Sequence, residues 1–359
     1  MMADCLAAVI TEFKGDLELQ RVPIPTLAPG GVLIRVDAAT LCGTDTHRWL
    51  GNFGTTRPFI PGHETCGTIV DTRGELRDIV GDPLKLGDRI ISSYPSCGQC
   101  YYCTVLRQVA LCRNVTIFGD SRPSALLGGC AEYHYFPPGG ALIRVPDEVA
   151  PRLAASAACA LRTVMNAYEQ LGRVESHETV LVLGAGPLGL YALAVARDRG
   201  ARKTLLIGAP ATRLAVARAW GADAVLDLER MPEPNRRTEW VREQTGGRGP
   251  DIVFQCAVPA TVAEGLEMVR PGGRLISIGI GGGPLTLPPI AFLKAVRINF
   301  VVMAEPRHFW QAVDFLATRH RRFDFERLIS GTYTLAQTTA ALRKMATFEE
   351  VKPVIIPAG

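Results

Sequence analysis

The stretch Val180-Leu181-Val182-Leu183-Gly184-Ala185-Gly186-Pro187-Leu188-Gly189 decides the fold, because an apolar strand enters a glycine-rich turn and then a helical stretch. The first glycine permits the tight turn, the second lets the backbone approach a pyrophosphate, and the third lets helix and strand pack closely. The phosphates then lie at the helix N-terminus. We therefore predict a dinucleotide-binding turn whose coenzyme-binding residues are Gly184, Gly186, Pro187, Leu188 and Gly189.

From Thr179 onward, short apolar segments alternate with helical stretches. Six segments carry this pattern: Val180 to Leu183, Thr204 to Ile207, Ala224 to Leu226, Ile252 to Phe254, Arg274 to Ile278 and Ile298 to Val302. Such alternation implies right-handed crossovers between parallel strands. We therefore predict an α/β fold with a doubly wound parallel Rossmann sheet, in a dinucleotide-binding domain that spans residues 160–302.

The strand after the glycine-rich turn lacks the acidic residue that usually binds the ribose hydroxyls. Gly208 stands at that position, followed by Ala209 and Pro210. Nothing there repels a 2′-phosphate, and Arg213, about a turn into the next helix, is placed to pair with one. We therefore favour NADP; the alternative is NAD with weaker ribose contacts and Arg213 as an ordinary surface residue.

The first 150 residues show short β-rich runs broken by Gly, Pro and Asp, such as Val32 to Val36 and Arg89 to Ile91. This pattern predicts a sheet-rich domain with long loops. After about residue 305 the alternation ends, and the chain finishes with helical stretches and the apolar run Val351 to Ile356. Because that tail is too short to fold alone, we expect residues 303–359 to pack onto residues 1–159, so that the second domain is an insertion in the first.

Size and charge agree with a two-domain enzyme and disfavour other classes. The chain has 359 residues, a formal net charge of +4 and ten cysteines. Its only dense basic cluster, residues 319–322, is read as a solvated turn, so no nucleic-acid partner is expected. No apolar run is long enough to cross a bilayer, and the N-terminus does not resemble a secretion signal. We therefore expect a cytoplasmic protein whose thiols are reduced and bind metal.

One group of cysteines is local. Cys97, Cys100, Cys103 and Cys112 lie within sixteen residues of one another, in the loop 97–112. Four thiols this close suit a closed, tetrahedral zinc site that holds a loop with little core of its own. We therefore predict a structural zinc site; a disulfide reading would require an oxidising compartment.

A second set of possible ligands is scattered. Cys42, His63 and Cys159 together offer two thiolates and one imidazole, which would leave a fourth tetrahedral position open for water or an alcohol. Sequence distance alone does not assemble them. Taken singly, each also has a plain explanation as a buried small residue or a polar loop side chain.

The order of these motifs resembles that of the zinc-containing medium-chain alcohol dehydrogenases. Cys42-Gly43-Thr44-Asp45-Thr46-His47, Gly62-His63-Glu64, the four-cysteine cluster, Cys159 and the glycine-rich turn occur in the family's order across nearly the whole chain. The resemblance implies a GroES-like catalytic domain formed by residues 1–159 and 303–359. It also implies two zinc ions per chain, NAD or NADP, and a homodimer or homotetramer. The activity would be that of an oxidoreductase acting on an alcohol or the matching carbonyl.

The resemblance also implies individual roles. Cys42, His63 and Cys159 would hold the catalytic zinc, with Glu64 beside the metal and Asp45 orienting the imidazole. Thr44 would take the alcohol proton, and His47 would pass it through the coenzyme ribose to solvent.

Two features of the sequence bear on this family pattern. Eight residues separate Cys103 from Cys112, one more than usual in the family, although the loop is free to adjust. Lys352 falls where the family places a basic residue near the pyrophosphate, and a surface lysine is the alternative.

The resemblance also implies that the substrate pocket is lined by residues after His47 and by residues just before the cysteine cluster. Its candidate residues are Trp49, Leu50, Phe53, Ser93 and, more weakly, Phe118. Their apolar walls favour a medium-sized or cyclic alcohol, primary or secondary, over ethanol. Two alternatives stay open: a polyol or amino-sugar dehydrogenase of the same zinc type, and a non-catalytic zinc-binding module that keeps the fold.

Overall fold

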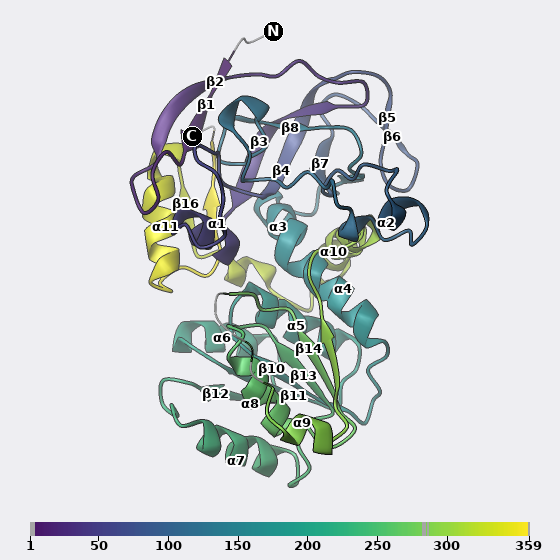
Figure 1. The fold of residues 1–359 in the computed structure, drawn as a ribbon, viewed down its shortest axis with the longest axis vertical. Coiled ribbons are helices and arrows are strands. Elements are labelled where there is room, and N and C mark those ends of the chain that lie inside the picture. The colour runs from purple at the N-terminus through teal and green to yellow at the C-terminus, as the bar shows by residue number, and fades with distance from the viewer. Residues whose placement is uncertain (1–3, 282–284, 286, 358–359) are drawn as a thin grey trace. The chain divides into compact units, whose positions relative to one another are not determined.

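The computed structural model describes residues 4–281, 285 and 287–357. They form two compact units (Figure 1). The first unit comprises Met1–Arg162, Met303–His320 and Phe325–Gly359, and the second comprises Thr163–Val302 and Arg321–Asp324. In the described part of the chain, no helix is long and apolar enough to cross a membrane.

The second unit is built on a parallel sheet of six strands. Its order is β12-β11-β10-β13-β14-β15, so the chain starts in the middle, winds to one edge and then returns to build the other half. The strands are β10 (Thr179–Leu183), β11 (Lys203–Gly208), β12 (Ala224–Asp227), β13 (Ile252–Gln255), β14 (Arg274–Ser277) and β15 (Arg297–Phe300). The predicted doubly wound sheet is therefore confirmed, with strand ends that differ by one or two residues.

One helix precedes the first of these strands, and the other helices connect them. They are α4 (Arg162–Leu171), α5 (Pro187–Asp198), α6 (Ala211–Ala219), α7 (Pro234–Gln244), α8 (Thr261–Met268) and α9 (Ile290–Leu293). The central strands are almost wholly apolar because helices cover both of their faces. In β10, for example, Val180 to Leu183 are all buried.

The first unit contains a sheet of order β16-β17-β3-β4-β7-β9, with β8 also paired to β3. These strands are β3 (Val32–Thr40), β4 (Glu64–Thr72), β7 (Arg89–Ser92), β8 (Tyr133–Phe136), β9 (Leu142–Arg144), β16 (Gly331–Tyr333) and β17 (Pro353–Ile355). Two small sheets pair β1 (Asp4–Val9) with β2 (Glu18–Pro23) and β5 (Leu76–Arg77) with β6 (Pro83–Leu84). The β-rich domain expected from the broken apolar runs is thus confirmed.

Short helices punctuate the first unit. They are α1 (Gly43–Trp49), α2 (Tyr101–Thr104), α3 (Pro151–Ser156), α10 (Pro306–Arg319) and α11 (Thr338–Ala346). Single turns lie at Val109–Leu111 (η1), Pro123–Ala125 (η2), Phe325–Leu328 (η4) and Leu335–Gln337 (η5), and a π-helix, η3, spans Ala157–Leu161.

The C-terminal strand joins the sheet of the first unit. β17 pairs antiparallel with β3, placing Val354 opposite Thr40 and Ile355 opposite Ala39. The α11 helix (yellow in Figure 1) packs beside α1. This pairing carries Lys352, which directly precedes β17, to the inner end of β3. The last residues of the described chain therefore reach the segment that begins with Cys42.

All ten cysteines are free. Four of them have no place in either metal-binding group and are buried: Cys5, Cys66, Cys130 and Cys256. Burial raises the pKa of each of these thiols. These four cysteines are therefore packing residues, because a protonated, buried thiol behaves as a small apolar group.

Candidate active site and metal centres

The N-terminus of α1 holds the first thiol. Cys42 is the N-cap residue, and its Sγ accepts a hydrogen bond from the Thr44 backbone N at 3.3 Å. Asp45 returns the contact, since its Oδ2 accepts from the Cys42 backbone N at 3.0 Å. The two contacts form a capping box that fixes the thiol at the positive end of the helix, where a thiolate is favoured.

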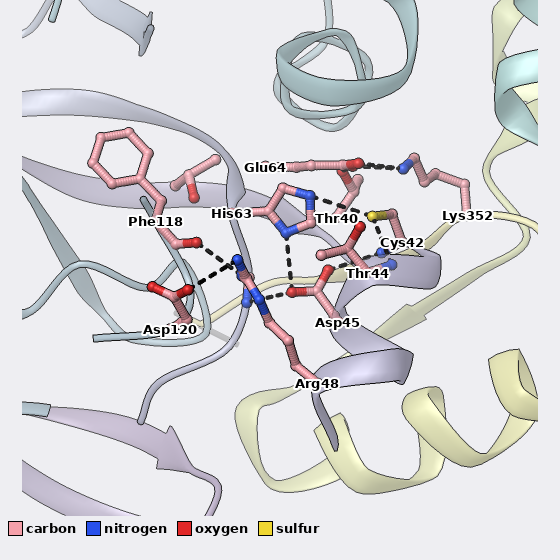
Figure 2. A network of polar contacts seen from close by, with 12 residues as sticks. Thr40, Cys42, Thr44, Asp45, Arg48, His63, Glu64, Phe118, Asp120 and Lys352 are labelled. Carbon is pink, nitrogen blue, oxygen red and sulfur yellow. Dashed lines mark hydrogen bonds and ion pairs between the residues drawn. The ribbon is translucent and has the colours of Figure 1, made fainter. Parts of the chain in front are cut away.

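Asp45 also orients the imidazole of His63. Its Oδ1 accepts hydrogen bonds from the Gly62 backbone N at 3.0 Å and from His63 Nδ1 at 3.1 Å, and the Asp45 side chain is fully buried. The other ring nitrogen, Nε2, then lies 3.3 Å from Cys42 Sγ. Figure 2 shows the carboxylate on one side of the ring and the sulfur on the other. A carboxylate on Nδ1 leaves Nε2 free to bind a metal.

Glu64 begins β4 and is held by two partners. Lys352 Nζ lies 2.7 Å from its Oε1 and 2.6 Å from its Oε2, and Thr40 Oγ1 donates to the same carboxylate (Figure 2). Glu64 and Lys352 are both fully buried. Burial raises the pKa of Glu64 to about 7, an effect that the lysine charge opposes. The interpretation of Lys352 as a surface residue is therefore wrong, because the C-terminal strand carries it into the interior as the counter-charge of Glu64.

Cys159 completes the cluster from the π-helix η3. Single π turns are rare and frequently lie at functional sites, because the extra residue redirects a side chain. The metal-binding atoms of Cys42, His63, Glu64 and Cys159 all lie within 4.8 Å of one another. A hydrogen bond from the Cys159 thiol lowers the pKa of Cys42 against the opposing effect of burial. The three scattered segments thus converge on one place, as the sequence predicted.

The donor set of this buried cluster fits zinc. Zinc binds sulfur at about 2.3 Å and imidazole nitrogen at about 2.0–2.1 Å in a tetrahedron, which separates a sulfur from a nitrogen by roughly 3.5 Å. The observed separation of 3.3 Å between Cys42 Sγ and His63 Nε2 agrees with that geometry. Two sulfurs and one nitrogen leave a fourth position for Glu64, water or an alcohol oxygen.

The four-cysteine loop also fits zinc. Successive Sγ atoms lie 3.5 Å apart (Cys100 and Cys103), 3.9 Å apart (Cys100 and Cys112) and 3.5 Å apart (Cys97 and Cys112). A zinc–sulfur tetrahedron requires roughly 3.8 Å. A hydrogen bond from the Gln99 backbone N–H lowers the pKa of Cys97 to about 6. The turn η1 accommodates the long spacing before Cys112, so the loop still closes.

The proposed relay residues follow on α1. Thr44 and His47 are half-buried, and His47 Nδ1 lies 3.2 Å from the amide nitrogen of Asn52. Phe53 stacks obliquely on the His47 ring at 5.0 Å between centroids and is 40% exposed. Both polar side chains are thus on the helix that carries Cys42 and have access to solvent.

Of the other predicted pocket residues, Trp49, Ser93 and Phe118 are buried, and Leu50 is half-buried. Trp49 belongs to the core of the first unit, where its indole N–H donates to the Gly15 carbonyl at 2.8 Å. Phe118 is 2% exposed and stacks on Phe136 at 5.5 Å. Ser93 Oγ accepts from the Ala141 backbone N at 2.8 Å. Aromatic residues suit a core as well as a pocket wall, so the sequence did not separate the two.

In the second unit, the glycine-rich turn is as tight as expected. A Cβ on Gly189 would lie 1.9 Å from the Gly184 carbonyl oxygen, whereas one on Gly186 would meet nothing within 4 Å. A Cβ on Gly208 would lie 2.6 Å from the Ala185 Cβ. Close packing against the turn therefore gives a steric reason for glycine at 208, in place of an acid.

Arg213, in α6, is 8% exposed, and burial lowers its pKa. It is not the ordinary surface residue of the alternative interpretation.

The exposed residues of the basic cluster 319–322 include Arg322, which pairs with Asp198 at 3.1 Å, in agreement with a solvated turn.

Comparison with known proteins agrees with this geometry. Residues 28–147 match the alcohol dehydrogenase GroES-like domain, and residues 187–318 match the zinc-binding dehydrogenase family. The chain is 33% identical to 5-exo-hydroxycamphor dehydrogenase of Pseudomonas putida, over 97% of this chain and 98% of that protein. The chain belongs to the zinc-binding medium-chain alcohol dehydrogenase family.

Three further relatives have lower sequence identity. L-idonate 5-dehydrogenase of Vitis vinifera is 27% identical, over 89% of this chain and 86% of that protein. An alcohol dehydrogenase of Thermotoga maritima has a TM-score of 0.91 at 27% identity and covers 99% of each chain. A zinc-binding dehydrogenase of Sinorhizobium meliloti bound to NADP has a TM-score of 0.85 at 28% identity, over 99% of this chain and 100% of that one.

Membership makes this dehydrogenase a zinc-dependent oxidoreductase that acts on alcohols or polyols with NAD(P), which sets aside the non-catalytic alternative.

Sequence reasoning missed one polar contact that shapes the site of this dehydrogenase. Arg48, 7% exposed, donates to the Phe118 carbonyl at 2.9 Å and to Asp120 at 3.2 Å (Figure 2). A Cβ on Gly119 would lie 3.2 Å from the His63 backbone N. The arginine therefore holds segment 118–120 against the backbone of His63, and nothing in the local sequence pairs residues so far apart.

Proposed function

We propose that this dehydrogenase oxidises a medium-sized or cyclic alcohol, primary or secondary, or reduces the matching carbonyl, with NADP as the preferred coenzyme. One observation carries the proposal: two half-buried thiols, a buried imidazole and a buried carboxylate lie together beside the helix that carries the hydroxyl of Thr44 and the imidazole of His47. The similarity to 5-exo-hydroxycamphor dehydrogenase supports a cyclic substrate.

Cys42, His63 and Cys159 would hold the catalytic zinc, with Glu64 as a nearby carboxylate. When bound, zinc supplies a Lewis acid that makes the alcohol easier to deprotonate, and the nicotinamide supplies a hydride acceptor. Thr44 accepts the alcohol proton through its hydroxyl, and His47 carries the proton towards solvent. Asp45 fixes the His63 tautomer, and Lys352 neutralises Glu64, so the carboxylate can remain charged in the interior.

Cys97, Cys100, Cys103 and Cys112 would hold a second, structural zinc, because all four positions are filled by sulfur and none is left for a substrate.

Phe53 offers exposed apolar surface next to His47 for the pocket. Ser93, which directly precedes Tyr94, is buried and would contribute its hydroxyl from the interior. Trp49 and Phe118 would support these walls from the core. The polyol or amino-sugar alternative differs in pocket contents alone, and the similarity to L-idonate 5-dehydrogenase favours keeping the polyol reading as the second candidate.

The coenzyme preference depends on the second unit. Gly184, Gly186, Pro187, Leu188 and Gly189 would bind the pyrophosphate, as in other glycine-rich turns of this kind. Gly208 presents no carboxylate against a 2′-phosphate, and Arg213 adds a positive charge in the following helix. The similarity to the S. meliloti protein bound to NADP supports the same choice. A role for Lys352 near the pyrophosphate is a weaker proposal, because its ammonium group is engaged by Glu64.

We further propose that residues 1–159 and 303–359 form the catalytic domain and residues 160–302 the coenzyme domain.

A homodimer or homotetramer is supported by exposed apolar side chains near the edge strand β15, among them Phe292, Leu293 and Phe300. A cytoplasmic location is supported by the ten free thiols.

The test is a panel of alcohols and carbonyls assayed with each coenzyme by the absorbance of the reduced nicotinamide. The proposal expects larger kcat/KM for cyclic or medium-sized alcohols than for ethanol, and tighter binding of NADPH than of NADH in a titration. Ethanol as the best substrate would overturn the substrate proposal, and the reverse order of coenzyme affinity would overturn the coenzyme proposal.

A further inference from the structure

Arg162 stands directly after the π-helix that carries Cys159 and begins α4. It is 4% exposed. Its Nε donates to the Ala158 carbonyl at 3.2 Å, but its Nη1 has no hydrogen-bond partner among residues 4–281, 285 and 287–357. A buried donor without an acceptor is costly, so such a group in a native fold needs an explanation.

The positive charge of Arg162 is also without a counter-charge. Within the described part of the chain, no carboxylate lies at ion-pair distance from it. By contrast, two other arginines of similar burial are paired, Arg48 with Asp120 and Arg237 with Glu264. Since a guanidinium stays protonated, the fold leaves one buried cation unpaired beside a metal ligand.

Two aromatic rings flank this cation. The guanidinium carbon lies 5.5 Å from the centre of the Tyr94 ring and 5.3 Å from that of Phe309. Ring faces stabilise a cation and hold its plane, but they accept no directional hydrogen bond from Nη1. The rings therefore fix where the donors lie without satisfying them.

Tyr94 connects Arg162 with the metal-binding cluster. Burial raises the pKa of the Tyr94 phenol, and the positive charges of His63 and Arg162 oppose that rise. The Tyr94 ring lies beside the guanidinium of Arg162, which follows Cys159 by three residues. Like Nη1, the Tyr94 hydroxyl has no protein hydrogen-bond partner among the described residues. An unsatisfied guanidinium donor thus lies about one helical turn from Cys159, a proposed ligand of the catalytic zinc.

We propose that Arg162, with Tyr94 beside it, binds a carboxylate of the substrate, so that the preferred substrate is a medium-sized or cyclic alcohol that also carries an acid group. This inference rests on the proposed function. A guanidinium matches a carboxylate with two parallel N–H donors, and an anion there removes the uncompensated charge. A site built around such donors discriminates strongly against a ligand that lacks the acceptor.

The test compares a cyclic hydroxy acid with its primary amide, which has nearly the same shape and no charge. The wild-type enzyme is expected to prefer the acid by at least about 100-fold in kcat/KM. Arg162→Met should abolish this preference by raising KM for the acid, with the amide changed little. Arg162→Lys should keep part of the preference. Arg152→Met, an exposed arginine paired with Glu326, is the matched control and should keep all of it.

Binding without turnover gives an independent readout. Cyclohexanecarboxylate should bind the zinc-loaded enzyme more tightly than cyclohexanecarboxamide in calorimetry, and Arg162→Met should remove the difference. If Arg162→Met does not fold, the wild-type comparison and Arg162→Lys still decide. Equal use of acid and amide by the wild-type enzyme, or an unchanged preference in Arg162→Met, would overturn the proposal. Failure to oxidise either class would instead contradict the proposed function.

Discussion

Both metal-binding groups contain cysteine thiols, but the groups differ in where their ligands come from along the chain and in what surrounds them. In the loop 97–112, all four candidate ligands come from one segment, three of the four cysteines are partly exposed, and backbone N–H groups lower the pKa of Cys97 and Cys100. In the buried cluster, the ligands come from a helix N-cap, the start of β4 and a π-helix. Fully buried Asp45, Glu64 and Lys352 surround them.

This difference indicates a structural role for a metal in the cysteine loop and a catalytic role for a metal in the buried cluster. A local site fastens a segment that has little core, so losing its metal should cost stability. The buried cluster is assembled by the fold itself, through the sheet contacts of β3, β4 and β17. Its metal can therefore keep an open position for chemistry. Variants of each site should fail in different ways.

Removing a ligand of the buried cluster should have the largest effect. Cys42→Ala is expected to lower kcat/KM by at least about 10³-fold, because the Lewis acid is lost, while the cysteine loop keeps its zinc. Zinc content should fall from two ions per chain to one. Cys5→Ala, which also removes a buried thiol, is the control and should keep both zinc and activity. Unchanged turnover in Cys42→Ala would erase the distinction between the two sites.

Removing the hydroxyl of Thr44 should come next. Thr44→Ala is expected to lower kcat by about 10²–10⁴-fold through loss of proton transfer, with zinc content intact. Thr44→Ser retains the hydroxyl and should recover most of the rate. Steady-state kinetics with parallel metal analysis provides the measurement, and a Thr44→Ala enzyme with normal turnover would exclude the role.

Disrupting the cysteine loop should lower stability more than the rate. Cys100→Ser is expected to lose one zinc, to be cleaved sooner by proteases within 97–112 and to melt at a lower temperature. The shift should be about 2–4 °C for each kcal/mol that the site contributes. Turnover per folded molecule should stay near that of the wild type. A loss of activity as large as that of Cys42→Ala, with melting unchanged, would reverse the assignment of the two sites.

Lowering the pH should reduce the stability of the protein because of the buried imidazole of His134. The ring of this residue packs edge-on against both Phe118 and Phe136, and burial lowers its pKa to about 3. The unfolded chain binds a proton near pH 6.5 and the native state does not, so stability falls as the pH is lowered from about 6.5 towards 3. The limiting slope is about 1.4 kcal/mol per pH unit.

His134→Asn should reduce this acid-side slope in denaturant titrations at several pH values. The exposed His177→Asn should leave it unchanged. An identical slope in His134→Asn and wild-type protein would contradict the assignment.

The fold and the candidate metal ligands could be predicted because they depend on residues close together in sequence or on the order of motifs along the chain. The alternation of apolar segments predicted all six strands of the parallel sheet, and four cysteines in one loop predicted their own site. The buried cluster needed the order of several motifs along the chain, since spacing alone did not bring Cys42 to Cys159.

Long-range electrostatics and packing were not predictable. The partner of Glu64 is 288 residues away in Lys352, and only the pairing of β17 with β3 reveals it. Trp49 and Phe118 suited a pocket wall as well as a core, and the structure places them in packed surroundings. The unpaired state of Arg162 likewise depends on what surrounds it in three dimensions.

The most direct test of the account is zinc K-edge X-ray absorption on the Cys100→Ser protein, in which the buried cluster should hold the only zinc. We predict a shell of two sulfur atoms at about 2.3 Å and two nitrogen or oxygen atoms at about 2.0–2.1 Å. A shell of four sulfurs, a shell without sulfur, or a protein without zinc would contradict the claim that Cys42, His63 and Cys159 share a catalytic metal.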